Sequence, residues 1–296
     1  MKQLFYLILT VILLFQSAVN SFAAVSATVE ATSSQPLFLE LWNNAAFYDT
    51  NLEKKKYASV LARFEGKAGL NVFRYPLQVY GVYYGAASQS NDYWDNYFYS
   101  GGGVRLIPFR DFYGKDWRTE WLSGLKIYYE DLSASYFKNA ASAEALAKKD
   151  TRYGVEIWHE WNQDNPDYRL PWAELWFNYS HRETNFGWEE FKTDVMNVQP
   201  KLGIYLSDVI KAYLRGDLVA SYKEGPSYTF LNVADYGLGV RFEPWRGTQT
   251  RDDLLKKFKM FLEVLGVSYL KGYEPTDPGK RVSSDVRFGI EFSYGR

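Results

Sequence analysis

From residue 35 onward, polar and apolar side chains alternate with a period of two along most of the chain. This pattern predicts β-strands that have one polar and one apolar face. In the segment 60–72, Val60 and Phe64 fall on one face, whereas Arg63 and Glu65 fall on the other. Twelve segments follow the pattern, at 36–47, 58–73, 76–87, 95–108, 120–136, 151–162, 171–182, 193–206, 209–223, 228–243, 254–271 and 284–296.

The lengths of the segments and of their connections favour a membrane barrel. Several segments have twelve or more residues, and a strand tilted by about 45° crosses a bilayer in about 9–11 residues. The links at 73–76 and 206–209 are very short, whereas those at 87–95, 137–150 and 271–284 are long and polar. Short turns on one side and long loops on the other are typical of outer-membrane barrels.

The predicted fold class is therefore all-β: an antiparallel transmembrane β-barrel of about 12 strands. A secreted β-sandwich or propeller is the alternative, because it would show the same alternation with the apolar face buried and the charges outside. Nine of the ten prolines fall at or near segment ends, where a strand can lose a backbone donor. Pro200 is the exception, which predicts a bulge or a misplaced strand start. The segment 228–243 loses its alternation part-way, which predicts a second bulge.

The N-terminus resembles a secretory signal. Residues 1–23 combine a basic residue, an apolar stretch at 4–15 and small residues before a predicted cleavage after Ala23. An uncleaved anchor is the alternative, but a helix of twelve residues is about 18 Å long, short of a hydrocarbon core of about 30 Å. The expected organisation is a signal peptide, a periplasmic N-terminal segment at 24–34 and a barrel at 35–296.

Composition limits the chemistry. Trp 10, Tyr 25 and Phe 20 make the chain 19% aromatic, which excludes a disordered protein. The 34 basic and 35 acidic residues nearly cancel, so charge gives no support for binding nucleic acid. The absence of cysteine excludes disulfides and thiolate ligands, and two histidines do not favour a histidine-based metal site. No cofactor and no metal are predicted.

The chain repeats itself. The stretch GGGVRLIPFR at 101–110 matches GLGVRFEPWR at 237–246 at six of ten positions, with an offset of 136. Two further matches follow in the same order: ASYFK at 134–138 with VSYLK at 267–271, and RYGVEI at 152–157 with RFGIEF at 287–292. Their offsets, 133 and 135, place strands four to six over strands ten to twelve. A barrel of two six-strand halves would give this pattern; shared strand composition is the alternative.

The last segment carries a specific motif. Arg287, Gly289, Phe292 and Tyr294 stand in the order polar-x-Gly-x-x-aromatic-x-aromatic. This motif resembles the C-terminal targeting signal of Gram-negative outer-membrane barrels, which the barrel assembly machinery reads. In that signal the chain usually ends on the final aromatic residue, whereas here two more residues follow.

The C-terminal half also resembles the porin domain of exopolysaccharide export proteins of the poly-N-acetylglucosamine type. The resemblance covers about 170–296 and rests on VQPKL at 198–202, YGLGVRFEPWR at 236–246, FLEVLGVSYLK at 261–271 and DVRFGIEFSYGR at 285–296. It implies a barrel in the outer membrane that helps a polysaccharide chain to cross. Such exporters often carry a periplasmic helical-repeat domain and more strands, and this sequence shows neither. An export role would therefore need a periplasmic polysaccharide export protein as a partner.

If the charged face lines the interior, it supplies the candidate contacts to a polysaccharide. These are Arg63, Glu65, Arg105, Tyr128, Arg152, Glu156, Trp158, Glu160, Trp176, Arg215, Arg241, Lys257, Lys259, Arg287 and Glu291. The aromatic members, together with Trp42, would stack on sugar faces. The competing interpretation is structural, because buried charges are costly unless paired, so many of these residues would form ion pairs that hold the barrel closed.

The sequence does not favour an enzyme. His159 and His181 fall on the apolar face, but the second residue after His181 is Glu183, where outer-membrane phospholipases have serine. Without a paired nucleophile, a lipid hydrolase is the weakest alternative. A general porin, or an adhesin or phage receptor acting through its loops, remains open. Apart from export proteins, the expected partners are outer-membrane lipid and the assembly machinery, with no nucleic acid.

Overall fold

The computed structural model describes the chain between residue 36 and residue 295, with gaps. The described residues are 36–52, 56–72, 76–89, 96–110, 120–137, 146–162, 170–186, 190–221, 232–246, 255–270 and 281–295. The predicted signal peptide at 1–23 and the segment at 24–34 lie outside them. Residues from Leu37 onward form one compact unit.

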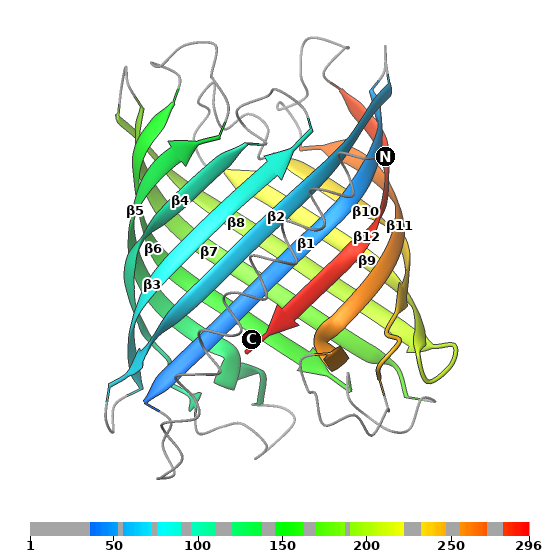
Figure 1. The fold of residues 1–296 in the computed structure, drawn as a ribbon, viewed down its shortest axis with the longest axis horizontal. Helices are drawn as coiled ribbons and strands as arrows, with labels where there is room; N and C mark the ends of the chain where they lie inside the picture. Colours follow the sequence, from blue (N-terminus) through cyan, green and yellow to red (C-terminus); the bar gives the residue numbers. More distant parts are fainter. Residues whose placement is uncertain are drawn as a thin grey trace. The chain divides into compact units, whose positions relative to one another are not determined.

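This unit is a closed barrel of twelve antiparallel strands, which confirms the predicted fold (Figure 1). Each strand pairs with its neighbours in sequence, and β1 pairs with β12 to close the wall. The strands are β1 (Leu37–Leu52), β2 (Lys56–Asn71), β3 (Leu77–Ser88), β4 (Tyr97–Leu106), β5 (Leu125–Tyr136), β6 (Ala147–Trp161), β7 (Trp172–Phe186), β8 (Glu190–Tyr205), β9 (Ile210–Ser221), β10 (Val233–Phe242), β11 (Phe258–Tyr269) and β12 (Val282–Tyr294).

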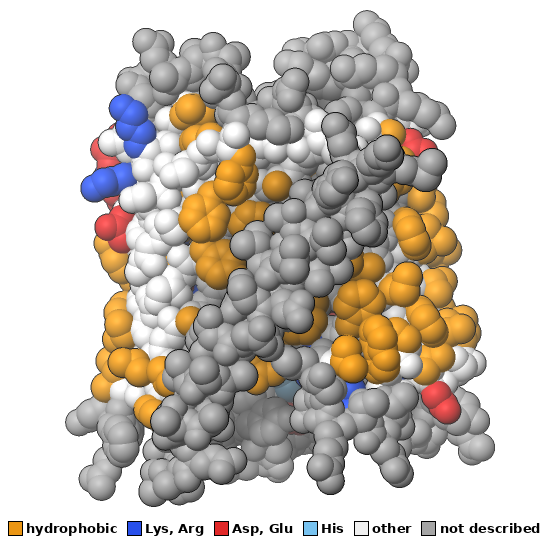
Figure 2. Space-filling model, in the orientation of Figure 1, with side chains coloured by type: hydrophobic (Ala, Val, Ile, Leu, Met, Phe, Trp, Pro, Cys, Tyr) orange, Lys and Arg blue, Asp and Glu red, His pale blue; other side chains and the backbone are white. Residues whose placement is uncertain are grey.

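The apolar face of the strands points outward. Leu70, Leu214 and Leu238 are exposed on the outer wall, whereas Glu130 and Arg241 are buried inside. Hydrophobic side chains cover much of the outer surface that Figure 2 shows. The sandwich and propeller alternatives are therefore wrong, because those folds would bury the apolar face. Backbone groups can be satisfied in lipid only when a sheet closes on itself, as this one does.

Two seams join the halves β1–β6 and β7–β12, and they share one register. At the β6–β7 seam, Gly154 lies opposite Ser180. At the β12–β1 seam, Gly289 lies opposite Ala46. Gly289 follows Gly154 by 135 positions, and Ser180 follows Ala46 by 134. The second half therefore meets the first in the same way at both seams.

The repeat predicted for strands four to six extends to all six strands of each half. The Asn96 side chain accepts a hydrogen bond from Ser88 N and donates one to Ser88 Oγ, at 3.0 and 3.1 Å. Asn232 makes the same two contacts with Ser221, both at 2.9 Å. These contacts join β3 to the start of β4 and β9 to the start of β10. Strands three and nine thus belong to the repeat, although sequence matching did not reach them.

Two predicted strands start later than expected. The segment 120–136 begins with a 3₁₀ helix at Glu120–Gly124, and 254–271 includes a 3₁₀ helix at Leu255–Lys257. Lys257 is therefore not on a strand, contrary to prediction, because the chain turns in the connection before β11. No helix among the described residues is long and apolar enough to span a membrane.

Neither predicted bulge is present in the described strands. Pro200 lies inside β8 and pairs with Leu175 of β7. The pairing of β8 with β9 passes from Val198 to Lys201 while β9 passes from Leu218 to Arg215, so no residue is inserted and only the ladder is interrupted beside the proline, which has no backbone donor. Val233–Phe242 pairs continuously with both neighbours, so the bulge expected in 228–243 is absent from the described strand β10.

The expected contrast between short turns and long loops is wrong. Successive connections of an antiparallel barrel alternate between its two ends. The end that carries the short turns 72–76 and 206–209 therefore also carries 107–124 and 243–257, the longest connections in the barrel. The predicted long connections do lie at the opposite end, but so does the short link 187–189.

Candidate functional site

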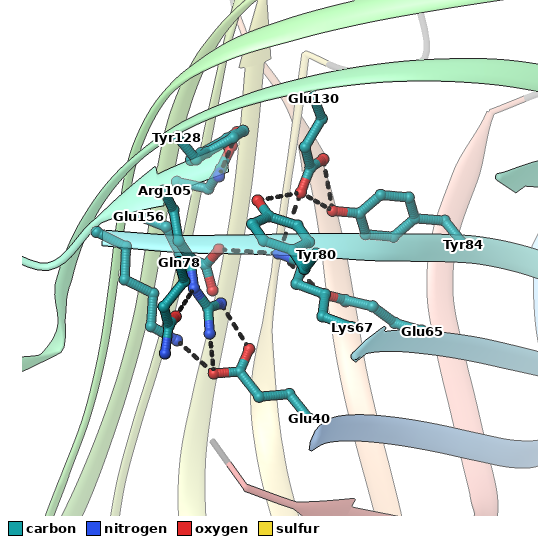
Figure 3. Close-up of polar contacts among 12 residues, drawn as sticks. Glu40, Glu65, Lys67, Gln78, Tyr80, Tyr84, Arg105, Tyr128, Glu130 and Glu156 are labelled. Carbon is teal, nitrogen blue, oxygen red and sulfur yellow. Dashed lines mark hydrogen bonds and ion pairs between the residues drawn. The ribbon is translucent and has the colours of Figure 1, made fainter. Parts of the chain in front are cut away.

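A group of inward-facing residues on β1–β6, most of them charged, is connected by hydrogen bonds, ion pairs and cation–π contacts and is here called the first cluster. It consists of Glu40, Glu65, Lys67, Gln78, Tyr80, Tyr84, Arg105, Lys126, Tyr128, Glu130 and Glu156. Figure 3 labels all of them except Lys126. Each strand contributes because its alternate residues point inward, so parity alone places these side chains in the interior.

Arg105 and Glu40 form a two-pronged ion pair. The two terminal nitrogens of Arg105 donate to the two oxygens of Glu40 at 2.7 and 2.6 Å. Lys126 Nζ also approaches Glu40, at 3.4 Å. Two parallel charge-assisted bonds fix the orientation of both groups as well as their distance. The pair holds β4 against β1 across the interior.

Glu130 is fully buried and fully supplied with donors. Its carboxylate accepts hydrogen bonds from Tyr80 Oη at 3.0 Å and Tyr84 Oη at 2.7 Å. Lys67 Nζ lies 3.4 Å from the same carboxylate and 3.5 Å from Glu156. Figure 3 shows Glu130 between the two tyrosine hydroxyls. A buried carboxylate is tolerated when its charge and its lone pairs are both satisfied, as they are here.

A glycine makes room for one of these tyrosines. A Cβ on Gly103 would lie 2.7 Å from Tyr80 Cζ, so the tyrosine ring lies directly against the β4 backbone. Arg105 follows two residues later on the same face. The repeated sequence Gly-Val-Arg thus combines a glycine that leaves room for the tyrosine ring with an arginine that pairs with a glutamate. This explains why these residue types recur in both halves.

Arg152 lies beside the first cluster. Its guanidinium pairs with Asp150 at 2.6 Å and lies over the Tyr84 ring, 5.0 Å from the centroid. The counterpart of this pair in the other half is Arg287 with Asp285, also at 2.6 Å. Arg287 makes a further ion pair with Asp235 at 2.7 Å.

The inward-facing charges of β7–β12 form the second cluster. It consists of Glu174, Lys201, Lys211, Tyr213, Arg215, Arg241, Glu243, Lys259, Glu263 and Glu291. Glu263 accepts from Tyr213 Oη at 2.7 Å and from Arg215 at 2.7 and 2.9 Å. Glu174 pairs with Lys201 at 2.7 Å and with Arg241 at 3.3 Å.

The side chains of each cluster pack against one another inside the barrel. Glu130 is 0%, Arg241 2% and Glu263 2% exposed, so water hardly reaches these side chains. Some of the contacts bridge strands that are not neighbours: Lys126 of β5 meets Glu40 of β1, four strands away. This supports the structural interpretation of the charged face.

Tryptophans lie between the clusters. On β6 and β7, Trp158 and Trp176 are directly opposite one another. They are flanked along the strands by Glu156 of the first cluster and Glu174 of the second. Trp176 Nε1 has no hydrogen-bond partner among the described residues. In the described wall, no other two inward tryptophans are directly opposite one another in the strand register.

Most of the predicted site residues come together in or beside the two clusters. Ion pairs or hydrogen bonds join Glu65, Arg105, Tyr128, Arg152, Glu156, Arg215, Arg241, Lys259, Arg287 and Glu291 to their neighbours. Arg63 is exposed and lies over the Tyr48 ring at 5.7 Å. Glu160 lies opposite Glu174 in the register of β6 and β7.

Sequence reasoning missed the tyrosines that serve the buried acids. Tyr80, Tyr84 and Tyr213 share the inward face with charged neighbours, but aromatic residues on the apparent polar face were not treated as polar groups. The signal was present, because Tyr80 and Tyr213 are 133 positions apart, as are Glu130 and Glu263.

The residues of the assembly motif occupy the last strand. Phe292 pairs with Phe258 on one side and Asn43 on the other, on the outward face of β12. Tyr294 faces the same way, whereas Arg287 points inward. A Cβ on Gly289 would meet the backbone of Ala46, 2.6 Å from its Cα, which explains the glycine. Recognition by the assembly machinery stays a prediction.

The two histidines lie on the outward face. His181 Nδ1 is 2.8 Å from Asp194 Oδ1. The His159 ring packs edge-on against Trp161, with centroids 4.4 Å apart. Among the described residues, no group of three or more histidine and acidic side chains is placed to hold a metal ion.

A closed antiparallel wall with an apolar exterior and a charged interior defines the class of this protein. It is a transmembrane β-barrel of the outer-membrane type. No family model matches the chain, and no curated protein matches its sequence.

Several solved structures share the barrel architecture at low sequence identity. The NanC porin is 7% identical, with a TM-score of 0.42, over 85% of this chain and 98% of that one. The KdgM porin is 9% identical, with a TM-score of 0.36, over 86% and 99%. The translocator domain of autotransporter NalP from Neisseria meningitidis is 8% identical, with a TM-score of 0.32, over 95% and 96%. None of these three is described as an exopolysaccharide exporter, and similarity at this level does not bear on function.

Proposed function

We propose that this barrel assists the passage of an exopolysaccharide across the outer membrane, together with a periplasmic export partner. The observation that carries the proposal is the inward pair Trp158 and Trp176, held between two groups of paired charges. Indole faces stack on sugar rings, and a polymer that must move on needs several modest contacts rather than one tight one. The sequence resemblance over 170–296 supports the same substrate class.

The packed interior adds a condition to this proposal. Because the clusters occupy the interior at their level, we expect a sugar chain to pass only after ion pairs exchange partners or separate. The binding energy for that change would come from the export partner or from the polymer itself. The resting barrel is accordingly expected to be closed, which also prevents leakage of small solutes when no polymer is present.

The test is a gene deletion in the native host with complementation. The deletion should abolish surface polysaccharide and leave its cytoplasmic synthesis intact, and the wild-type gene should restore export. Complementation with Trp158→Ala and Trp176→Ala together should restore the barrel but only part of the export. The matched control is Leu238→Ala on the outer wall, where the side chain is 65% exposed and contacts no sugar. Normal surface polysaccharide in the deletion strain, with no redundant barrel present, would contradict the proposal.

The buried clusters favour a second candidate, a closed barrel that serves as an adhesin or phage receptor. Buried interior ion pairs, such as Lys67 with Glu130 at 4% and 0% exposure, are also what a barrel needs when it only anchors external loops. In that case the deletion would abolish phage adsorption or adhesion and leave polysaccharide unchanged. A general porin is distinguished by reconstitution in a planar bilayer, because only a porin would show steady conductance as the isolated wild-type barrel.

A further inference from the structure

Among the described residues of the outer wall, β5–β8 carry a strongly polar region, here called the outer polar patch. It lies on β5–β8 and consists of Asp131, Lys149, Thr151, Tyr153, His181, Glu183, Lys192 and Asp194. Its members contact one another: Thr151 donates to Asp131 at 3.2 Å, and Lys192 donates to Glu183 at 3.2 Å. In Figure 2, charged side chains gather at the left edge near the upper ends of β5 and β6, whereas the right-hand wall is mainly hydrophobic.

The internal repeat provides a control for the depth of this patch. Because the two halves repeat strand by strand, equivalent positions lie at the same height along the barrel axis. The equivalents on β11, β12, β1 and β2, in the same order, are Val264, Ser284, Val286, Phe288, Phe47, Asp49, Ala58 and Val60. Val264 is 54%, Phe288 55% and Phe47 44% exposed. One side of the barrel therefore presents large apolar groups at the height where the other presents charges.

This difference means that the two sides face different surroundings. A charged side chain on the lipid face of a barrel costs about 2–4 kcal/mol at the bilayer midplane and less towards the interface. Phe288 and Phe47 suit acyl chains, whereas their equivalents Tyr153 and His181 suit a polar neighbour. Within the membrane, the patch is favourable only where a polar neighbour covers it, whereas the opposite wall needs no such cover.

The charges of the patch identify the neighbour. Asp131, Glu183 and Asp194 slightly outnumber Lys149 and Lys192, with His181 beside Asp194. An anionic lipid headgroup needs an excess of basic groups, which is not found here. Both signs on one surface, in near balance, suit an isologous contact, in which a two-fold axis brings the acids of one copy to the lysines of the other. We propose that the outer polar patch is the interface through which two copies of this chain pair side by side in the membrane.

The chain contains no cysteine, so single cysteines report on this interface directly. Asp131→Cys, Thr151→Cys, His181→Cys and Lys192→Cys would each be treated in intact outer membranes with a short bis-maleimide. At least one of them should give a cross-linked dimer. The matched controls Val264→Cys, Val286→Cys, Phe47→Cys and Ala58→Cys, at the equivalent positions, should give none. Heat-modifiable gel mobility shows in each case that the barrel is folded.

A second variant tests the proposal without cross-linking. Asp131→Val, Thr151→Val, Tyr153→Phe, His181→Phe, Lys192→Ala and Asp194→Val together give six of the eight patch positions the apolar residues of the opposite wall. The wild type should be dimeric by light scattering in mild detergent, and this variant monomeric while still folded. A dimer that survives these substitutions would overturn the proposal. So would cross-linking that is equal on both walls or absent from both, or lipopolysaccharide that co-purifies with the wild type and is lost from the variant.

Discussion

The two six-strand halves have the same frame but connect their charges differently. In the first half, Glu130 binds Tyr80, Tyr84 and a lysine, whereas in the second half Glu263 binds Tyr213 and the guanidinium of Arg215. The lysine that serves Glu130 is Lys67, and its equivalent Lys201 instead pairs with Glu174 at 2.7 Å. The equivalent arginine pairs differ as well: Arg105 lies 2.6 Å from Glu40, whereas Arg241 lies 3.3 Å from Glu174.

The comparison shows which interior residues are the same in both halves and which can be exchanged. The tyrosine, its carboxylate partner and the glycine beneath the ring occur in both halves, because the ring can lie against the β-strand only at a glycine and its hydroxyl then reaches the carboxylate. The cation is interchangeable, since a lysine or an arginine can neutralise the same buried acid. Position 78 is glutamine where 211 is lysine, and position 82 is valine where 215 is arginine.

The largest effect is expected from removing the shared carboxylate. Glu263→Ala leaves Arg215, whose side chain is 16% exposed, with Asp217 as its remaining ion-pair partner among the described residues. Breaking one partner of a buried pair costs about 3–5 kcal/mol. Glu130→Ala should cost less, because Lys67 keeps two other acids within 3.6 Å. Urea unfolding in lipid vesicles, followed by heat-modifiable mobility, measures the free energy of unfolding of both variants. Equal losses of stability would mean that the different ion-pair arrangements of the two halves have no energetic consequence.

The next effect concerns the outward aromatics of β12 and their equivalents on β6. Phe292→Ala with Tyr294→Ala should reduce the folded barrel in the outer membrane several-fold, because these residues form the predicted assembly signal. Ile157→Ala with His159→Ala alters the equivalent positions away from the end of the chain. It should leave assembly near the wild-type level, as judged by membrane fractionation. A similar loss in both variants would indicate a packing effect and not a signal.

A smaller effect is expected at the glycines beneath the tyrosine rings. Gly103→Ala and Gly239→Ala should each cost about 1–3 kcal/mol, as overpacking does. In both halves the new methyl group would displace a tyrosine from its carboxylate. Gly102→Ala is the control, since its Cβ would lie in ordinary contact, 3.8 Å from Tyr80 O. Unfolding midpoints in urea would show whether the two halves respond alike, and a loss in Gly102→Ala would refute the explanation.

The smallest change in stability is expected when an ion pair of the second half is replaced by the residues found at the equivalent positions of the first half. Lys211 pairs with Glu243 at 2.9 Å, where the first half has Gln78 and Ile107. Lys211→Gln alone leaves a buried acid poorly paired and should cost about 1–3 kcal/mol. Adding Glu243→Ile should recover most of that loss, because an apolar replacement of a buried pair is often neutral. A double-mutant cycle by urea unfolding gives the coupling, and additive losses would show that the pair does not act as a unit.

Parity along the strands was enough to predict the fold and most of the interior. Alternation gave the number of strands and the inward face of residues such as Arg105 and Glu263, because a side chain on a strand can point only in or out. It did not find where the chain turns before β11, so Lys257 was placed on the wrong element. A 3₁₀ turn of three residues interrupts the alternation too briefly to be read from one sequence.

The partners within the interior could not be predicted in the same way. Parity places Lys67 inside but does not say that it meets Glu130 and Glu156, which lie three and four strands away. That choice depends on the shear of the barrel and on which rings occupy the space between. The equivalent Lys201 makes a different choice with the same parity.

The shared register of the two seams has a consequence for how the chain becomes a barrel. The β6–β7 seam closes a link of ten residues, 162–171, whereas β12 must find β1 across roughly 230 residues. Loop-closure entropy grows by about 0.6 kcal/mol for each doubling, so the second seam starts about 2.5–3 kcal/mol less favourably than the first. The free edges of β1 and β12 thus stay unpaired the longest. The edge of β7 can pair with β12 in the same register as β1 does. In an incomplete barrel, β12 can therefore pair with β7 of another chain. Strand exchange between two folding barrels is the misfolding reaction with which correct closure competes.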